Sequence, residues 1–422
     1  MKRLYLLIII LYCQIGKAQY TTIPDVNFEQ ELIDQGIDSD LTINGQILTS
    51  DINSITSLIL NNATTGSIVN FTGIEGFVAL QELFFSANSL QIINLSNNIN
   101  LKKIILADPQ ISNINISSNL ALEYFSLAGA NNITTIDVSN NANLKELRIG
   151  FFNLAQLDVS NNINLEILSL KYTLINQIDL SQNTLLKKIQ LGENQFSSID
   201  VTHNTILKEL DVFSNSLTNL NVNQNPLLEV LHCGNNLITS LNLNNNPLLN
   251  VLSCNNYIGN TNNNYLTSIY LQNGSNTLLN GVYNLGEGGT IPIYLNRFDS
   301  TNNPNLHCIF VDDVTNCNSN WPGKDSTSSY VSTQQECNNL GNETFIINDE
   351  ITIYPNPTNG ILNINSNINS ITKVIIYDIL GKVVLERSNN FEQLNISNLT
   401  NGLYLVKIST ENKTVVKKIM KK

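Results

Sequence analysis

Two consecutive stretches, LDVSNNINLEILSLKYTLINQ at residues 157–177 and IDLSQNTLLKKIQLGENQFSS at residues 178–198, follow one pattern of 21 residues. The pattern occurs eight times between Ile93 and Asn256, and successive starts are 21 residues apart except for one spacing of 22. The starts are Ile93, Ile114, Ile136, Leu157, Ile178, Ile199, Leu220 and Leu241. An asparagine stands five residues after every start and a leucine eight residues after it. Such regularity indicates a structural repeat.

A unit of 21 residues is too short to bury its own apolar face, so successive units must stack and share one core. Positions 11 and 13 after each start are apolar, as at Leu168 and Leu170. This alternation predicts a short strand with those side chains pointing inward, and stacked strands would form a parallel sheet. The asparagine at position 5 predicts an inward amide that bonds backbone groups left unpaired by a sharp turn. These asparagines are Asn98, Asn119, Asn141, Asn162, Asn183, Asn204, Asn225 and Asn246.

A column of carboxylates stands one residue after four of the starts, at Asp137, Asp158, Asp179 and Asp200. Carboxylates about 5 Å apart repel one another, and calcium would offset that repulsion. Other units place asparagine at this position, for example Asn115. The substitution favours a short side-chain acceptor for a turn over a calcium site.

The repeat resembles the leucine-rich repeats, whose signature L-x-x-L-x-L-x-x-N-x-L is readable as LKKIQLGENQF at residues 186–196 and LEVLHCGNNLI at residues 228–238. The nested second half of each unit, such as IDLSQN at residues 178–183, is similar to the 21-residue class of bacterial leucine-rich repeats. The resemblance implies a mainly β fold, a curved solenoid with a parallel sheet on its concave side. The regular repeats are expected over residues 72–256.

The start of the chain has the pattern of a secretory signal peptide at residues 1–19, with Lys2 and Arg3 before an apolar run. A lipid anchor on Cys13 is the alternative, but bulky Tyr12 before it favours ordinary cleavage. The run is too short to span a membrane, so no transmembrane segment is expected in the mature chain. Residues 20–71 would form an N-terminal cap, with an amphipathic helix inside residues 23–36 that covers the first edge of the solenoid.

Residues 257–340 follow the repeat loosely, as degenerate repeats and a C-terminal cap would. Outside the cytoplasm a disulfide among Cys308, Cys317 and Cys337 is expected, with Cys308–Cys337 the first choice and Cys308–Cys317 the second. Cys233 and Cys254 occupy the same inward position of adjacent units. They are expected to be free thiols in the core, because parallel side chains rarely reach disulfide torsion.

Residues 341–350 read as a polar linker, and residues 351–422 carry short β-rich segments between turn signals, which predicts a β-sandwich. This segment resembles the C-terminal sorting domain of type IX secretion cargo in Bacteroidetes. The resemblance implies recognition by the outer-membrane secretion machinery and a secreted or outer-membrane-surface location. The matching motif residues are Tyr354, Pro355, Asn356, Pro357, Gly360, Asp378, Gly381, Gly402, Tyr404 and Lys407.

Composition and motifs argue against catalysis and nucleic-acid binding. The chain has 13% charged residues and a net charge of −12, without the clustered cations that phosphates require. The three histidines, His203, His232 and His307, have no zinc-type or nucleophile-type companion motif, and no nucleotide-binding glycine motif is present. No enzyme, metal or cofactor is therefore expected.

Function is then expected on a surface of the solenoid. Positions 12, 14 and 15 of each unit point out of the strand and can vary without breaking the core. Aromatic residues beside charges at these positions suggest a ligand-binding face for a protein or a glycan, as in adhesion. The candidate residues are Arg148, Phe151, Lys171, Tyr172, Glu193, Asp211, Phe213 and His232. The alternative is a structural surface or matrix component that needs no specific ligand.

Overall fold

The computed structural model describes residues 19–422 apart from 62–65, 87–88, 108–109, 130–131, 151–152, 258–262, 275, 280–281, 285–293, 341–350, 367–370 and 411–413. Most of the expected signal peptide and all of the expected linker lie outside these residues. The chain divides into two compact units, residues 1–333 and 334–422. Each unit is described by itself.

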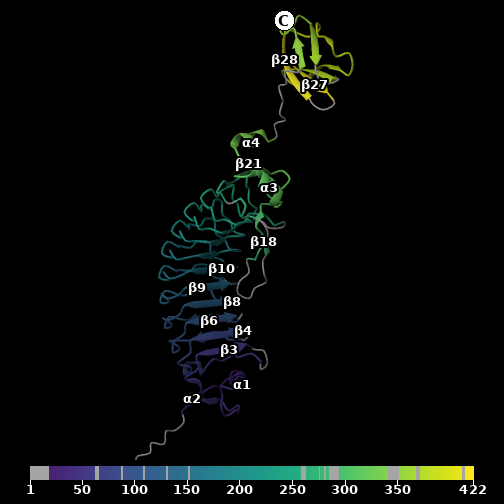
Figure 1. Cartoon of the computed structure of the whole chain (residues 1–422). Helices are drawn as coiled ribbons and strands as arrows, with labels where there is room; N and C mark the ends of the chain where they lie inside the picture. The colour runs from purple at the N-terminus through teal and green to yellow at the C-terminus, as the bar shows by residue number, and fades with distance from the viewer. Residues whose placement is uncertain are drawn as a thin grey trace, which may run out of the picture. The chain divides into compact units, whose positions relative to one another are not determined.

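The first unit is a solenoid built on one sheet of eleven parallel strands (Figure 1). Neighbouring strands pair in the register of the repeat, so that Leu147 lies beside Leu168 and Leu168 beside Ile189. In sheet order the strands are β19 (Phe298–Asp299), β15 (Val251–Ser253), β13 (Val230–His232), β12 (Glu209–Asp211), β11 (Lys188–Gln190), β10 (Ile167–Lys171), β9 (Glu146–Gly150), β8 (Tyr124–Ala128), β6 (Lys103–Ala107), β4 (Glu82–Ser86) and β3 (Ser57–Asn61). The predicted mainly β, parallel solenoid is confirmed.

One apolar core runs through this unit from Ile23 to Tyr330. The leucines at position 8 of successive units, Leu144, Leu165 and Leu186 among them, are fully buried in it. Their burial confirms that the repeat exists because the coils stack and share an interior.

The asparagines at position 5 form the predicted ladder, and all eight are fully buried. The Nδ2 group of Asn162 donates to the backbone oxygens of Val138 and Asn141 in the preceding coil, both at 2.9 Å. Each amide therefore ties its turn to the turn before it. A second ladder, at position 16, appears in the later units, where Asn215 Nδ2 donates to Leu191 O at 2.9 Å and Phe196 N donates to Asn215 Oδ1 at 3.0 Å.

The carboxylates at position 1 are turn acceptors. Ser160 N donates to Asp158 Oδ1 at 2.9 Å, and the same two-residue bond recurs at the other three aspartates. These bonds from the serine or threonine two residues on lower the pKa of each carboxyl. The turn interpretation is therefore confirmed.

The N-terminal end carries the predicted helix, α1 (Val26–Asp34). Asp25 caps it, since Asp25 Oδ1 accepts from the backbone N–H groups of Asn27 and Phe28, and Phe28 is buried in the solenoid core. The other elements of this end are the antiparallel pair β1 (Tyr20–Thr22) and β2 (Gln46–Leu48), then α2 (Thr49–Ile52) and the 3-10 helix η1 (Ile74–Gly76). Figure 1 shows α1 beyond β3, at the first edge of the sheet.

The early and late coils also form shorter sheets at their far edge. A parallel pair, β5 (Ile92–Asn94) and β7 (Asn113–Asn115), serves the early units, and a four-stranded parallel sheet serves the late ones. That sheet has the order β14 (Ser240–Asn242), β16 (Ser268–Leu271), β20 (Cys308–Val311) and β21 (Ser329–Val331). A hairpin of β17 (Val282–Asn284) and β18 (Tyr294–Asn296) precedes β19.

The C-terminal end of the solenoid contains α3 (Val314–Asn320) and the buried Trp321, whose ring stacks on Phe298. Cys308 and Cys337 are both disulfide-bonded, whereas Cys317 is a free, buried thiol. This outcome agrees with the first expected pairing and excludes Cys308–Cys317. Cys233 and Cys254 are free and buried, as predicted.

The second unit begins with α4 (Gln334–Asn339) and contains two antiparallel sheets. One sheet has the order β22 (Ile351–Tyr354), β23 (Ile361–Ser366) and β26 (Gln393–Asn395). The other has the order β25 (Val383–Arg387), β24 (Ile371–Asp378), β27 (Gly402–Thr410) and β28 (Thr414–Lys421). Residues of both sheets, such as Leu362 and Val406, share one core, so the predicted β-sandwich is confirmed. None of the helices described in either unit is both long and apolar enough to cross a membrane.

Candidate binding face

The outward side of the eleven-stranded sheet brings most of the predicted ligand-binding residues onto one surface. We call the side chains at repeat positions 10, 12, 14 and 15 the outer face. Arg148 on β9, Lys171 on β10, Asp211 on β12 and His232 on β13 all belong to it, because in-register strands put equal positions side by side. Phe151 lies outside the described residues.

Asp211 is the centre of a charged cluster. Its Oδ2 lies 2.7 Å from Lys171 Nζ and its Oδ1 lies 3.1 Å from His232 Nδ1. Burial by itself would raise the pKa of Asp211, but His232 and then Lys171 more than offset it, so the pKa is lowered. Asp211 and His232 are both buried. The sequence suggested exposed groups here, and contacts with neighbouring strands account for the difference.

A second ion pair lies beside this cluster at position 10, which is not among the predicted ligand-binding positions. Lys188 Nζ lies 3.0 Å from Glu209 Oε2, and Gln190 Nε2 donates to Glu209 Oε1 at 3.1 Å. Burial raises the pKa of Glu209, although Lys188 opposes the shift. The sequence contains the information needed to predict this pair, because the period of two that places position 12 on the outer face also places position 10 there.

Arg148 is paired within its own strand. Its Nε forms an ion pair with Glu146 Oε1, two residues earlier on the same face. Both side chains are largely covered. From β9 to β13 the outer face therefore carries charged side chains of both signs that are fixed in ion pairs.

Aromatic rings border the charged cluster. The Phe213 ring stacks on the His232 ring at 4.6 Å between centroids and 16° between planes. Tyr257 meets Phe213 edge-on at 5.3 Å. Tyr172 is 48% exposed and Tyr257 is also exposed. Exposed tyrosines on a rigid support are typical of interface anchors.

The residue at position 15 adopts a left-handed backbone in four consecutive units. The φ angles are 56° at Tyr172, 58° at Glu193, 54° at Ser214 and 51° at Asn235. Glycine and asparagine accept this conformation readily, whereas other residues pay about 1–3 kcal/mol each. We use the name strand-end ridge for the accessible side chains at position 15 or directly next to it, which are Tyr172, Glu193, Phe213 and Tyr257.

The ridge is continuous along the solenoid. Tyr172 N donates to Gly192 O at 3.4 Å, and Glu193 N donates to Phe213 O at 2.9 Å. Tyr257 N donates to Asn235 Oδ1 at 2.7 Å and contacts Phe213 through its ring. Successive coils therefore hold the ridge residues in fixed relative positions.

Three residues with hydrolase-like side chains, Asp211, His232 and Ser253, stand in register on β12, β13 and β15. Their geometry does not activate a nucleophile, because the Ser253 hydroxyl donates to Asn255 Oδ1 at 2.7 Å. Ser253 is also buried, so a substrate carbonyl could not reach it. Among the described residues, moreover, no group of three or more His, Cys, Asp or Glu side chains could hold a metal ion.

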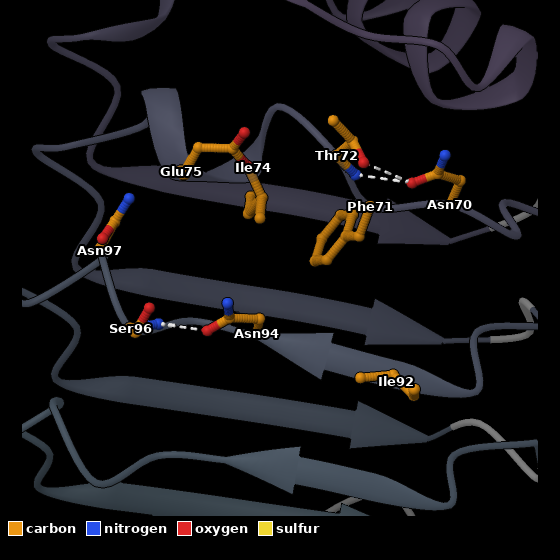
Figure 2. A pocket seen from close by; sticks show the side chains of 9 residues that line it. All are labelled: Asn70, Phe71, Thr72, Ile74, Glu75, Ile92, Asn94, Ser96 and Asn97. Atoms are coloured by element: carbon orange, nitrogen blue, oxygen red, sulfur yellow. Dashed lines mark hydrogen bonds between the residues drawn. The ribbon is translucent and has the colours of Figure 1, made fainter.

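A separate hollow of about 440 Å³ lies near the N-terminal end, between the chain at residues 70–75 and β5 (Figure 2). Thr72, which lines it, stands where the regular units begin with isoleucine or leucine. Thr72 donates through N and Oγ1 to Asn70 Oδ1 at 2.9 and 2.7 Å. Phe71 and Glu75 also line it, and Glu75 Oε2 accepts from Gly73 N at 2.9 Å. No predicted ligand residue lines this hollow, and we assign it no role.

In the second unit, several predicted sorting-motif residues have clear structural roles. Asn356 Nδ2 donates to Lys418 O and Asn356 Oδ1 accepts from Met420 N, both at 2.9 Å, so this side chain is bonded to β28. Gly360 has φ 140° and lies so close to Ser397 that a Cβ would clash. The buried Tyr404 donates its hydroxyl to Thr400 O at 2.8 Å. The remaining motif residues are Tyr354, Pro355 and Pro357, which are exposed before β23, Asp378 and Gly381 at the β24–β25 turn, and Gly402 and Lys407 on β27.

Comparison with known families decides the identity of this unit. The family model for the secretion system C-terminal sorting domain matches residues 352–422. This segment is a type IX sorting domain. The sorting domain indicates export to the cell surface or beyond. No curated protein sequence matches the chain.

Comparison with solved structures bears on the solenoid. The functional domain of InlJ from Listeria monocytogenes, described as including a cysteine ladder, is similar with a TM-score of 0.50 and 18% identity, over 97% of this chain and 99% of that one. Internalin C2 from the same species gives a TM-score of 0.42 and 17% identity over 49% and 93% of the two chains. Internalin F gives 0.40 and 17% over 74% and 96%. The solenoid has the leucine-rich-repeat fold.

Proposed function

We propose that the chain is an exported leucine-rich-repeat protein. Residues 1–19 act as a cleaved signal peptide that takes it out of the cytoplasm, its sorting domain takes it to the type IX machinery, and its solenoid binds a protein ligand through the strand-end ridge. The leucine-rich-repeat fold supports a role in binding rather than catalysis. The observation that carries the choice of surface is the left-handed backbone at Tyr172 and Glu193.

The strain at these residues needs an explanation beyond the turn. Asn235 makes the same turn in a later unit with a residue suited to it. The solenoid would therefore be as well or better served by asparagine at positions 172 and 193. Where a protein keeps unfavourable backbone conformations, they are concentrated at functional sites. At position 172 the strained backbone carries an exposed tyrosine ring in place of an asparagine side chain.

The charged cluster beneath the ridge supports binding by holding it rigid. Lys171, one residue before Tyr172, is fixed by its ion pair with Asp211, and His232 supports the Phe213 ring. A surface that is ordered before binding loses less side-chain entropy on association. The ridge thus combines accessible aromatic rings with a support that does not need to rearrange.

A protein ligand fits this surface better than a glycan. The ridge is an extended row across several coils rather than a closed pocket, and anchors of this kind suit a macromolecular interface. Glycan binding, and a structural role with no ligand at all, remain outcomes of the test.

The test compares Tyr172→Asn with Tyr265→Asn in the purified mature chain, probed on an array of cell-surface protein ectodomains and on a glycan array. Tyr265 is 55% exposed and lies outside the ridge, so it is a matched control. We expect Tyr172→Asn to weaken binding to a protein at least tenfold, or about 1.4 kcal/mol, with no loss of thermal stability.

Each other result has a defined meaning. Equal binding by the native chain and Tyr172→Asn would refute the ridge as the interface. Binding confined to the glycan array would replace the protein ligand by a sugar. No binding on either array would favour a structural surface component.

A further inference from the structure

The sorting domain presents its most exposed apolar side chains at a single turn. Leu380 is 88% exposed and Ile379 is 70% exposed, the two highest values among the large hydrophobic residues of the described chain. They occupy the turn between β24 and β25. Neither residue packs on the sandwich core, so the fold itself gives no reason for apolar side chains there.

The turn is held rigidly from within. Asp378 Oδ1 accepts from Leu380 N at 2.9 Å and from Lys382 N at 3.0 Å. Gly381 N donates to Asp378 O at 3.0 Å, and Gly381 has φ 83°, which suits glycine. Leu380 is therefore presented at a fixed position on a closed turn, as an anchor residue would be.

The charge of this segment differs from that of the rest of the chain. Residues 351–422 carry nine Lys and Arg against four Asp and Glu, a net charge of +5 in a chain of −12. Lys382 lies next to the apolar pair and is exposed. A segment of net positive charge with an exposed lysine beside its apolar anchor is complementary to an acidic partner.

We propose that Ile379 and Leu380 are the docking anchor of the sorting domain, and that they insert into an apolar pocket bordered by carboxylates on a protein of the secretion machinery. The inference rests on the proposed export function and adds the residues and the chemistry of recognition to it. The family match supplies the reason for a partner, since a sorting domain must be read by the apparatus that exports it. Asp378 and Gly381 are positioning residues in this account.

The experiment uses the full chain expressed in its own host, with Leu380→Ser as the test variant and Leu41→Ser as the control. Leu41 is 66% exposed and lies in the N-terminal cap, so both changes remove an exposed leucine without opening a cavity. Quantitative immunoblots of medium, surface and periplasm measure export. We expect export of Leu380→Ser to fall at least tenfold, with accumulation in the periplasm, and export of Leu41→Ser to be unchanged.

Two further variants keep the result interpretable. Leu380→Met retains an apolar side chain and should export normally, whereas Lys382→Glu should lower export several-fold. Equal thermal stability of purified Leu380→Ser and native protein would confirm that folding is intact. Normal export of Leu380→Ser, while deletion of residues 351–422 blocks export, would overturn the anchor but leave the sorting function. Normal export of the deletion would overturn the sorting function itself.

Discussion

Replacing Asn162 by alanine tests the stacking of the coils most simply. The amide is fully buried and donates to Val138 O and Asn141 O at 2.9 Å each. Both oxygens also accept backbone bonds, from Asn141 N and Leu144 N, so neither becomes wholly unpaired. The loss should therefore be about 1–3 kcal/mol in total, the range for one buried polar group, and not twice that range.

The assay is urea unfolding of the mature chain, followed by the fluorescence of the buried Trp321. Asn161→Ala is the matched control, because Asn161 is the exposed neighbour and its Nδ2 makes one long bond, 3.3 Å, to Ser139 O. We expect the control to change the free energy of unfolding by less than about 0.5 kcal/mol. Equal effects of the two substitutions would refute the ladder as a source of stability.

Three other predictions follow from burial, from charge and from the sorting domain. Cys233, Cys254 and Cys317 are buried free thiols, and burial raises the pKa of Cys233 to about 12. All three should therefore resist iodoacetamide at pH 8 in the native chain and react in urea. Mass spectrometry of the unreduced protein should then show three added labels. The pKa of Asp211 is lowered in the folded chain, so its ionised form stabilises the fold above the unfolded pKa, near 3.8, and this stability is lost as the pH falls toward the folded pKa. The urea midpoints measured at pH 6 and at pH 3 should therefore differ less for Asp211→Asn than for the native chain. Deleting residues 351–422 should leave the protein in the periplasm, and surface proteolysis of intact cells would detect any that escapes.

Much of the fold could be predicted from the sequence because the same physical requirement applies to each of the eight repeat units. Leu165 and Asn162 recur at fixed positions since every coil needs the same buried contact and the same turn bond. The turn role of Asp158 followed from the asparagines that replace it in other units. Cys308 and Cys337 are both disulfide-bonded and Cys317 is a free thiol, which agrees with the first expected choice.

The candidate site was less predictable, because a repeat constrains its inward positions and leaves its outward ones free. Glu209 and Lys188 at position 10 are not among the predicted site residues, although the period of two along a strand places them on the outer face. The burial of Asp211 and His232 depends on contacts between neighbouring coils that spacing alone does not reveal. The left-handed backbone of Tyr172 gives no sequence signal, since glycine or asparagine would be the usual sign of it.

The claim that the strand-end ridge is the binding surface is tested most directly by site-specific photocrosslinking on living cells. A photoreactive phenylalanine analogue placed at Tyr172 should give one dominant crosslinked protein species. The same analogue at Gln177, which is exposed on a different part of the same coil, should give none. Equal crosslinking at both positions, or crosslinking at Gln177 alone, would contradict the account.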